Sequence, residues 1–306
     1  MKKKLIPAPD VRGIGTEREN PRSADLDTKS ALEIARIINA EDRAVPVAIE
    51  RVLPQIARAI DAAAEALRRG GRIIYVGTGT SGRLGALDAS ECPPTFNADP
   101  KMVQFVIAGG EKALSRAIEA DEDSPALGER DMARKKPGSR DLVVGLAASG
   151  RTPYTVAAVQ YARTKGAVTV AVTANSDLAL ARVVHIPIVV EVGPEVIAGS
   201  TRMKAGTMQK LVCNMITTGA FTRLGYVYGN LMVNVHLKNR KLVERAMGIV
   251  QRITAVDRTR AVAALEEAQG SVPIALVMIK TGFSRRDARK RLASARGNVR
   301  NAIAGQ

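Results

Sequence analysis

The spacing of hydrophobic residues changes twice along the chain. Between residues 27 and 70 apolar positions recur three and four apart, and the segment closes on Gly-Gly, which predicts a helical lead-in. Continuous apolar strands that alternate with helices are typical of a parallel sheet covered on both faces, so the next part of the chain predicts a doubly wound α/β fold. The apolar runs that carry this prediction are residues 72–76, 103–108, 141–147, 167–173 and 185–190.

Helical spacing returns after Gly199, where we expect the strands to stop. It predicts long helices over residues 200–225 and 230–256, followed by several short helices. The predicted regions are a helical lead-in at residues 1–60, a sheet-containing domain at residues 61–225, and a helical region at residues 226–306 with a small helical subdomain from about residue 257.

Composition favours a globular protein of the cytoplasm. The 306 residues are 46% hydrophobic, enough to bury a large core. No run of about 18 uncharged apolar residues occurs, and the opening MKKKLIPAPDVRG lacks the apolar segment of a signal peptide, so we expect no membrane span. Cys92 and Cys213 form no disulfide framework and no metal-ligand spacing, which indicates plain thiols in a reducing compartment.

The chain is strongly basic. Lys and Arg number 46 against 30 Asp and Glu, a formal net charge of +16 that is often a sign of nucleic acid binding. Aromatic residues are only 3% with no Trp, however, and the basic residues are scattered or lie near the C-terminus. Because stacking platforms for bases are scarce, we favour a solvated basic surface with an anionic small substrate, and nucleic acid is disfavoured as a partner.

Two predicted strand-to-helix turns share a Ser-Gly-Arg sequence, GTGTSGR at 77–83 and AASGRT at 147–152. Turns at the carboxyl ends of strands in an open α/β sheet face the crevice where ligands bind. Glycine lets backbone N–H groups approach an anion, and hydroxyl groups add donors, so both turns predict a phosphate site. Its expected residues are Gly79, Thr80, Ser81, Gly82, Ser149 and Thr152.

Two other interpretations of the first turn are weaker. Gly and Ser could simply form a tight turn. Gly77, Gly79 and Gly82 also fit the G-x-G-x-x-G pattern of dinucleotide sites, but that pattern needs an acidic residue at the end of the next strand, and Glu111 comes late, after two glycines. The dinucleotide interpretation also leaves the second turn at Ser149 unexplained, whereas a phosphomonoester explains both turns.

Longer motifs carry a family resemblance. The two turns resemble the SIS (sugar isomerase) domain, which binds phosphosugars and has a doubly wound parallel sheet. The segments TERENPRSADLD, GTGTSGRLGALDASECPPTF, GPEVIAGSTRMKAGTMQK and YGNLMVNV, in this order, are similar to the N-acetylmuramic acid 6-phosphate etherases of bacteria, from about Thr16 to the C-terminus. The chain departs from the family pattern at Asn97, where Gly is usual, and at Asn234 and Arg240, where acidic residues are usual.

The resemblance implies a lyase that cleaves the D-lactyl ether of N-acetylmuramic acid 6-phosphate, giving N-acetylglucosamine 6-phosphate and D-lactate in cell-wall amino-sugar recycling. It implies elimination and hydration without a metal or redox cofactor. Glu91 would protonate the departing lactate and then activate water, and Glu122 would act as the base at C2. The family also implies a homodimer with sites near the interface, and it places Ser200 and Thr201 beside the sugar.

Each of these residues also has a structural interpretation. Glu122 lies in an acidic run at 119–124 that could be a solvated turn. Glu91 precedes Pro93-Pro94, which we expect to end a helix, so Glu91 is predicted to lie near the crevice. Ser200 and Thr201 could cap the helix that follows them.

Two functions of other classes remain open. A non-catalytic phosphosugar sensor, such as the glucokinase regulatory protein that resembles this family, needs the phosphate turns but not the paired carboxylates. A DNA-binding regulator with a SIS domain would account for the net charge, but the lead-in continues the etherase pattern instead of a helix-turn-helix.

Overall fold

The centre of the molecule is a five-stranded parallel sheet. The computed structural model describes residues 14–118, 121–176, 179–235, 237 and 240–305. Within this part of the chain the strand order is β2-β1-β3-β4-β5, and all neighbours are parallel. The doubly wound fold predicted from the apolar runs is confirmed. The strands are β1 (Ile73–Gly77), β2 (Val103–Ile107), β3 (Leu142–Leu146), β4 (Val168–Thr173) and β5 (Ile186–Val189).

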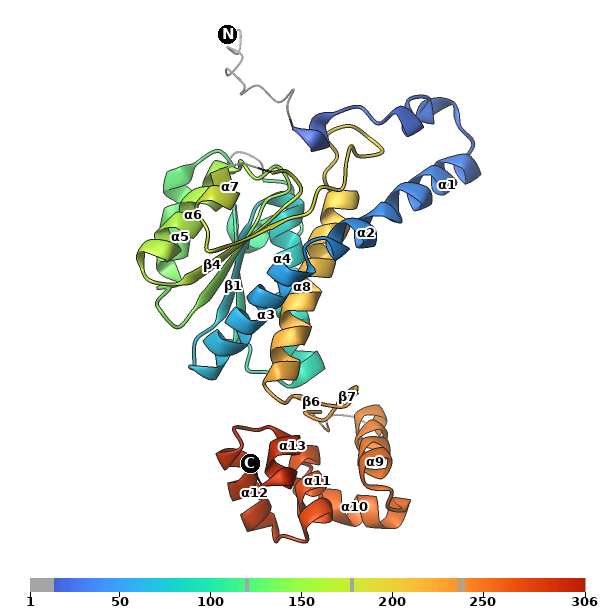
Figure 1. Cartoon of the computed structure of the whole chain (residues 1–306), viewed down its shortest axis with the longest axis vertical. Helices are drawn as coiled ribbons and strands as arrows, with labels where there is room; N and C mark the ends of the chain where they lie inside the picture. Colours follow the sequence, from blue (N-terminus) through green and yellow to red (C-terminus); the bar gives the residue numbers. More distant parts are fainter. Residues whose placement is uncertain (1–13, 119–120, 177–178, 236, 238–239, 306) are drawn as a thin grey trace.

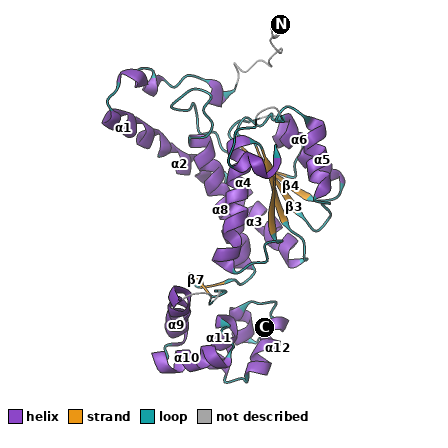
Figure 2. Cartoon of the chain, turned by 180° about the vertical axis from the view of Figure 1, so that it is seen from behind, coloured by secondary structure: helices purple, strands orange, loops and turns teal. Residues whose placement is uncertain are grey.

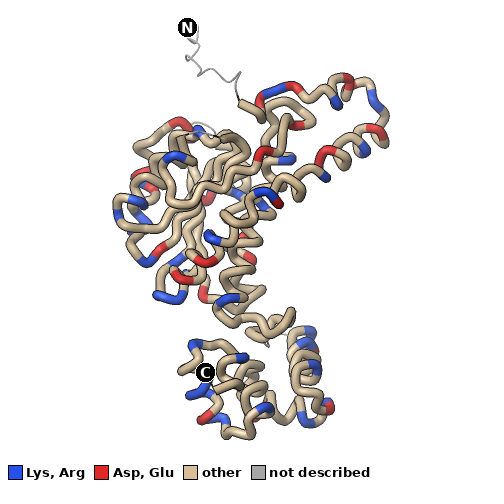
Figure 3. The backbone as a smooth tube through the Cα atoms, viewed as in Figure 1, with Lys and Arg blue, Asp and Glu red and all other residues tan. Residues whose placement is uncertain are grey.

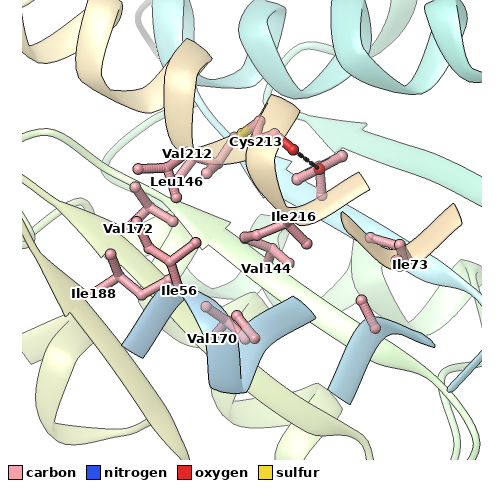
Figure 4. Close-up of a cluster of buried hydrophobic side chains, with 14 of the residues drawn as sticks. Ile56, Ile73, Val144, Leu146, Val170, Val172, Ile188, Val212, Cys213 and Ile216 are labelled. Carbon is pink, nitrogen blue, oxygen red and sulfur yellow. Dashed lines mark hydrogen bonds between the residues drawn. The ribbon is translucent and has the colours of Figure 1, made fainter. Parts of the chain in front are cut away.

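Helices cover both faces of the sheet (Figure 1). Every residue of β1 and β3 is buried, which is why these strands are uninterrupted apolar runs in the sequence. Figure 4 shows one of the two cores, where Val144, Val172 and Ile188 of the sheet lie against Ile56 and Ile216 of the covering helices. One face packs against α5 (Pro125–Arg134), α6 (Pro153–Thr164) and α7 (Ala179–Arg182), the other against α3 (Leu53–Arg68), α4 (Gly79–Phe96) and α8 (Lys204–Arg223).

The direction of the strand order reverses at β1. The chain passes from β1 to the edge strand β2 and then returns to β3 on the other side of β1. The helices that follow β1 and β3 lie on opposite faces, because α4 belongs to one core and α6 to the other. The turns after β1 and β3 are therefore adjacent at the carboxyl edge, which is where open α/β sheets bind ligands.

The prediction that Pro93 and Pro94 end a helix is wrong. Helix α4 continues through both prolines to Phe96, and Asn97 ends it in the left-handed conformation with φ 53°. The helix can continue because each proline removes only the hydrogen bond from its own nitrogen to the carbonyl group one turn earlier. The last turn is held in place by the buried ring of Phe96, which stacks on Phe221 at 4.5 Å between ring centroids. Asn is tolerated at position 97 because its short polar side chain adopts this backbone conformation more readily than most residues do.

The lead-in is helical, as predicted. Ser30 and Glu33 form a capping box at the start of α1, in which each side chain bonds the backbone of the other residue. Helix α1 extends away from the sheet domain, while α3 packs on the sheet (Figures 1 and 2). The elements are 3-10 turns at Gly15–Glu17, Pro21–Ser23 and Leu26–Thr28, then α1 (Ala31–Asp42), α2 (Ala44–Glu50) and α3; a further 3-10 turn, Gly110–Leu114, follows β2.

The C-terminal region departs from the prediction at its start. Strands do not stop after Gly199, since a two-stranded antiparallel hairpin lies between α8 and the last helices. The four short helices are each capped by a side chain at the N-terminus, and they share a core that is separate from those of the sheet domain. These elements are β6 (Val227–Tyr228), β7 (Leu231–Met232), α9 (Arg240–Thr254), α10 (Arg258–Glu267), α11 (Val272–Thr281), α12 (Arg285–Ser294) and α13 (Val299–Ala304).

This helical lobe lies at the amino edge of the sheet. Met102, just before β2, and Asn298, the cap of α13, line one pocket between the two parts. Helix α12 carries a dense run of basic residues, and Figure 3 shows them at the far end of the molecule from the carboxyl edge. The division of the chain at residues 60 and 225 stays a prediction.

Among the described helices, no single one has both the length and the apolar content needed to cross a membrane. Helices α10 and α11 meet both measures only when taken together, and they are bent by 114° relative to each other.

Candidate active site at the carboxyl edge of the sheet

The turn after β1 is too tight for side chains at its glycines. A Cβ atom on Gly77 would lie 2.9 Å from both the backbone nitrogen of Gly82 and the carbonyl oxygen of Leu146. Gly79 begins α4 with φ +48°, in the left-handed region that favours glycine. The first N–H groups of α4 are therefore presented at the carboxyl edge, where the positive end of the helix dipole favours an anion.

Glu122 lies beside this turn. A Cβ atom on Gly79 would be 3.3 Å from Glu122 Oε1, so the carboxylate faces the start of α4. The Glu122 carbonyl oxygen accepts a hydrogen bond from the Tyr154 backbone N–H at 3.1 Å, which fixes it next to α6. The side chain of Glu122 is partly buried, so the alternative of an open, solvated acidic turn does not describe its position.

The second Ser-Gly-Arg turn follows β3 and leads into α6. The Ser149 hydroxyl accepts a hydrogen bond from the Arg151 backbone N–H at 3.2 Å, and Gly150 adopts φ +70°. Thr152 precedes α6, and its side chain makes no capping hydrogen bond. Ser149 and Thr152 are both partly exposed. Their hydroxyl groups therefore lie near the start of α6. Thr152 comes two residues before Tyr154, whose backbone N–H bonds the Glu122 carbonyl oxygen.

Ser200 and Thr201 do not cap a helix, so that interpretation is wrong. Helix α8 begins at Lys204, and the backbone N–H groups of Lys204 and Ala205 donate to the buried carboxylate of Glu195 at 3.0 and 2.9 Å. The side chain that caps α8 comes from nine residues before Lys204. The hydroxyl residues just before the helix do not reveal it. Burial raises the pKa of Glu195, although these two N–H donors oppose the rise.

The start of α8 meets the first turn. A Cβ atom on Gly206 would lie 3.5 Å from the Thr201 carbonyl oxygen and 3.6 Å from Thr80 Cγ2. On the next turn of α8, Gln209 Oε1 lies 2.9 Å from Ser81 Oγ, and both side chains are buried. The structure thus brings Gly79, Thr80, Ser81, Glu122 and Thr201 together.

Lys204 is paired inside the protein. Its Nζ atom donates to Glu41 Oε2 at 2.6 Å, and Asn20 donates to the same carboxylate at 2.9 Å. Burial alone would raise the pKa of Glu41, but Lys204, Asn20 and Arg22 together hold it below its usual range. The pair joins α1 of the lead-in to the first residue of α8, three residues after Thr201.

Glu91 does not join this group within one chain. It lies twelve residues after Gly79 on α4, and a helix rises 1.5 Å per residue, so the two are about 18 Å apart along the helix axis. Its side chain is exposed. The expectation that Glu91 faces the crevice is wrong for a single chain, because the prolines do not turn α4 toward the site.

Another carboxylate on α4 is buried, and the sequence patterns did not single it out. Asp88 accepts hydrogen bonds from Tyr75 Oη at 2.8 Å, Asn214 Nδ2 at 2.6 Å and Thr217 Oγ1 at 3.2 Å. Burial raises the pKa of Asp88, and these three donors oppose the rise. An acidic residue on the apolar face of a predicted helix is the feature of the sequence that could have indicated this buried carboxylate. Its role is to hold α4 against α8.

Both cysteines are buried and free. Burial raises the pKa of the Cys92 thiol to about 12 and also raises that of Cys213, so neither is a nucleophile. Among the residues with described positions, no three His, Cys, Asp or Glu side chains gather as metal ligands would.

Comparison with known proteins places the chain in a family. Residues 55–163 match the glucokinase regulatory protein N-terminal SIS domain, and residues 128–219 match the SIS domain. The chain is 49% identical to the N-acetylmuramic acid 6-phosphate etherase of Pasteurella multocida over 293 residues, which cover 96% of this chain and 97% of the relative. The chain belongs to the N-acetylmuramic acid 6-phosphate etherase family.

Other etherases are similarly close. That of Edwardsiella ictaluri is 52% identical over 94% of this chain and 96% of its own length, and that of Symbiobacterium thermophilum is 55% identical over 89% and 91%. Among solved structures, a phosphoheptose isomerase from Francisella tularensis aligns with a TM-score of 0.49 and 20% identity, covering 62% of this chain and all of the other.

Proposed function

We propose that the chain cleaves the D-lactyl ether of N-acetylmuramic acid 6-phosphate, releasing D-lactate and N-acetylglucosamine 6-phosphate. Membership of the etherase family supports the reaction. The position of the Glu122 carboxylate, beside the Gly79 turn, is the structural observation that carries the proposal, because a base must reach the sugar while the phosphate is held. We place the reaction in the cytoplasm, where the free thiols Cys92 and Cys213 stay reduced.

The phosphate is assigned to the two Ser-Gly-Arg turns. The starts of α4 and α6 offer backbone N–H groups and two helix dipoles, and Ser81, Ser149 and Thr152 add hydroxyl groups. Thr201 and Ser200 are assigned to the sugar, since Thr201 lies beside Thr80 at the edge of the same turn. A phosphate bound here places C2 and C3 of the open-chain sugar within reach of Glu122.

The chemistry then needs two carboxylates. In the open-chain aldehyde the C2 proton is acidic, and Glu122 removes it. The electron pair forms a C2–C3 double bond as the C3–O bond breaks, and the lactate oxygen takes a proton from Glu91. Glu91, now a carboxylate, removes a proton from water as the oxygen adds to C3, and Glu122 returns a proton to C2.

Because Glu91 is about 18 Å from Gly79 in its own chain, we propose a homodimer in which the partner copy supplies it. The exposed face of α4 supports this arrangement. Leu87 is 50% exposed there, and Ser90, Glu91 and Pro94 follow at helical spacing, all of them exposed. A second copy seated on this face would cover Leu87 and Pro94 and would carry Glu91 to the neighbouring site.

Helix α1 also supports a second copy. Its only buried residue is Glu41, whereas the apolar side chains of Leu32, Ile34, Ile37 and Ile38 are exposed or only partly buried. An amphipathic helix normally buries its apolar side chains, whereas this helix extends away from the sheet domain (Figure 2). We assign these side chains to the dimer interface.

Release of D-lactate tests the proposed reaction. The purified protein is incubated with N-acetylmuramic acid 6-phosphate, and D-lactate is followed with a coupled dehydrogenase. We expect catalytic turnover, and no release from N-acetylmuramic acid without the phosphate. Binding of the phosphosugar without lactate would contradict the proposal and would instead indicate a phosphosugar sensor.

A further inference from the structure

The buried pair formed by Ser81 and Gln209 lies directly behind the first phosphate turn. Ser81 is the third residue of α4, and Gln209 lies on the second turn of α8 with no exposed surface. The Ser81 Oγ atom is 2.9 Å from Gln209 Oε1. The other atom of the amide, Nε2, is buried and has no hydrogen-bond partner in the described part of the chain.

This orientation of the amide has two costs. A buried amide N–H without a partner is unfavourable, because it gave up its hydrogen bonds to water. In addition, a carbonyl oxygen can only accept, so the Ser81 hydroxyl must donate its proton to Oε1. Ser81 then presents only lone pairs to a phosphate, whose oxygen atoms are themselves acceptors.

A half-turn of the amide about its last bond lowers the first cost, since one of the two Nε2 hydrogens gains a partner, and it removes the second. Oxygen and nitrogen exchange places, so Nε2 donates to Ser81 Oγ at the same 2.9 Å distance, and Oε1 takes the buried position. A carbonyl oxygen is left unpaired in proteins more readily than an N–H group is. The proton of Ser81 is then free to point toward the phosphate.

We propose that Gln209 is a positioning residue for substrate phosphate: it donates Nε2–H to Ser81 Oγ and thereby directs the Ser81 proton to a phosphate oxygen. This rests on the proposed function, since it requires the phosphosugar to be bound at Ser81. Gly206 lies beside Thr80, because a Cβ atom on Gly206 would be 3.6 Å from Thr80 Cγ2. The start of α8 is therefore close to the first turn of α4, and Gln209 follows Gly206 three residues later on the same face of α8.

The first test removes the donor. In Gln209→Met, which keeps the size of the side chain, we expect the KM for N-acetylmuramic acid 6-phosphate to rise about tenfold while kcat changes less than about twofold. Ser81→Ala should raise the KM by a similar factor. Because Gln209 acts through Ser81, the double variant should match Ser81→Ala alone instead of multiplying the two effects.

The second test uses the proton itself. In Gln209→Glu the ionised carboxylate only accepts, so it should hold the Ser81 proton away from the phosphate and raise the KM strongly. A protonated carboxyl can donate as the amide does, and burial favours that form. We therefore expect the ratio of the variant KM to the wild-type KM to fall at least about tenfold between about pH 8 and about pH 5.5. Gln160→Glu, at an exposed position on α6, is the matched control and should show a constant ratio.

The outcomes separate the two proposals. An unchanged KM in Ser81→Ala would overturn the phosphate site and this role of Gln209 together. A raised KM in Ser81→Ala with a wild-type KM in Gln209→Met, or a multiplied effect in the double variant, would overturn the role of Gln209 alone. So would a Gln209→Glu ratio that does not change with pH. The last comparison uses one folded variant at two pH values, with thermal unfolding as the control, so loss of the fold does not imitate it.

Discussion

Single side chains divide the proposed reaction into two steps. Glu122 lies beside the turn after β1, whereas Glu91 lies near the other end of α4. Removal of the C2 proton comes before cleavage of the ether, so a variant that lacks only the acid should still perform the first step.

Exchange of the C2 proton distinguishes the two roles. In Glu91→Gln we expect no lactate release, but we expect deuterium from solvent to replace the C2 proton of N-acetylglucosamine 6-phosphate, because Glu122 remains. Glu122→Gln should lose both activities. Proton NMR in deuterated water follows the C2 signal. Exchange that persists in Glu122→Gln but stops in Glu91→Gln would mean that the roles are reversed.

The residues also show where sequence patterns stop being informative. The two Ser-Gly-Arg turns could be predicted because glycine and hydroxyl residues are typical of a tight strand-to-helix turn; the phosphate site there stays a prediction. Gln209 could not be predicted, since a glutamine in a helix is ordinarily exposed and its partner Ser81 is remote in sequence. Glu195 could not be predicted as the cap of α8 either, because it lies nine residues before Lys204 and the hydroxyl residues in between offered a closer cap that the helix does not use.

At the scale of elements, the five strands were predictable and the helix ends were not. Strands buried on both faces must be apolar throughout, so β1 and β3 stand out in the sequence. The end of α4 depends on the stacking of Phe96 on Phe221, and the start of α8 depends on Glu195. Such contacts form only after the chain has folded.

The buried ion pair between Glu41 of α1 and Lys204 of α8 should contribute to stability. Glu41→Gln should lower the free energy of unfolding by about 3 kcal/mol near neutral pH, because Lys204 is left buried without its counter-charge. The pKa of Glu41 in the folded protein lies below its usual value, so the carboxylate stabilises the fold above the unfolded pKa, and this contribution disappears as the pH falls.

Urea unfolding at about pH 7 and about pH 4 checks this sign. The difference between wild type and Glu41→Gln should be smaller at the lower pH. Asp25→Asn, which removes an exposed pair with Lys29, serves as the control and should change stability little. A difference that stays constant or grows toward acid pH would show that the charge of Glu41 does not stabilise the fold.

At the scale of the whole molecule, the proposed function requires a second copy to complete the site. The two Ser-Gly-Arg turns and Glu122 lie at the carboxyl edge, whereas Glu91 lies about 18 Å along α4 from Gly79 and is exposed, as are Leu87 of α4 and Leu32 of α1. The sequence could not predict this position of Glu91, because the distance along α4 matters only once the helix is seen to continue to Phe96. The fold and the turns follow from local patterns, whereas the proposed completion of the site requires a second copy.

Mixed dimers test this claim most directly. Glu91→Gln and Glu122→Gln should each be inactive in lactate release. The two proteins are unfolded together, refolded and assayed with N-acetylmuramic acid 6-phosphate. If the partner supplies Glu91, a mixed dimer has one intact site, and random pairing should restore about a quarter of the activity of refolded wild type. Each variant refolded alone should stay inactive. Mixed dimers that form, as shown by a tag on one variant, but release no lactate would contradict a site shared between two copies.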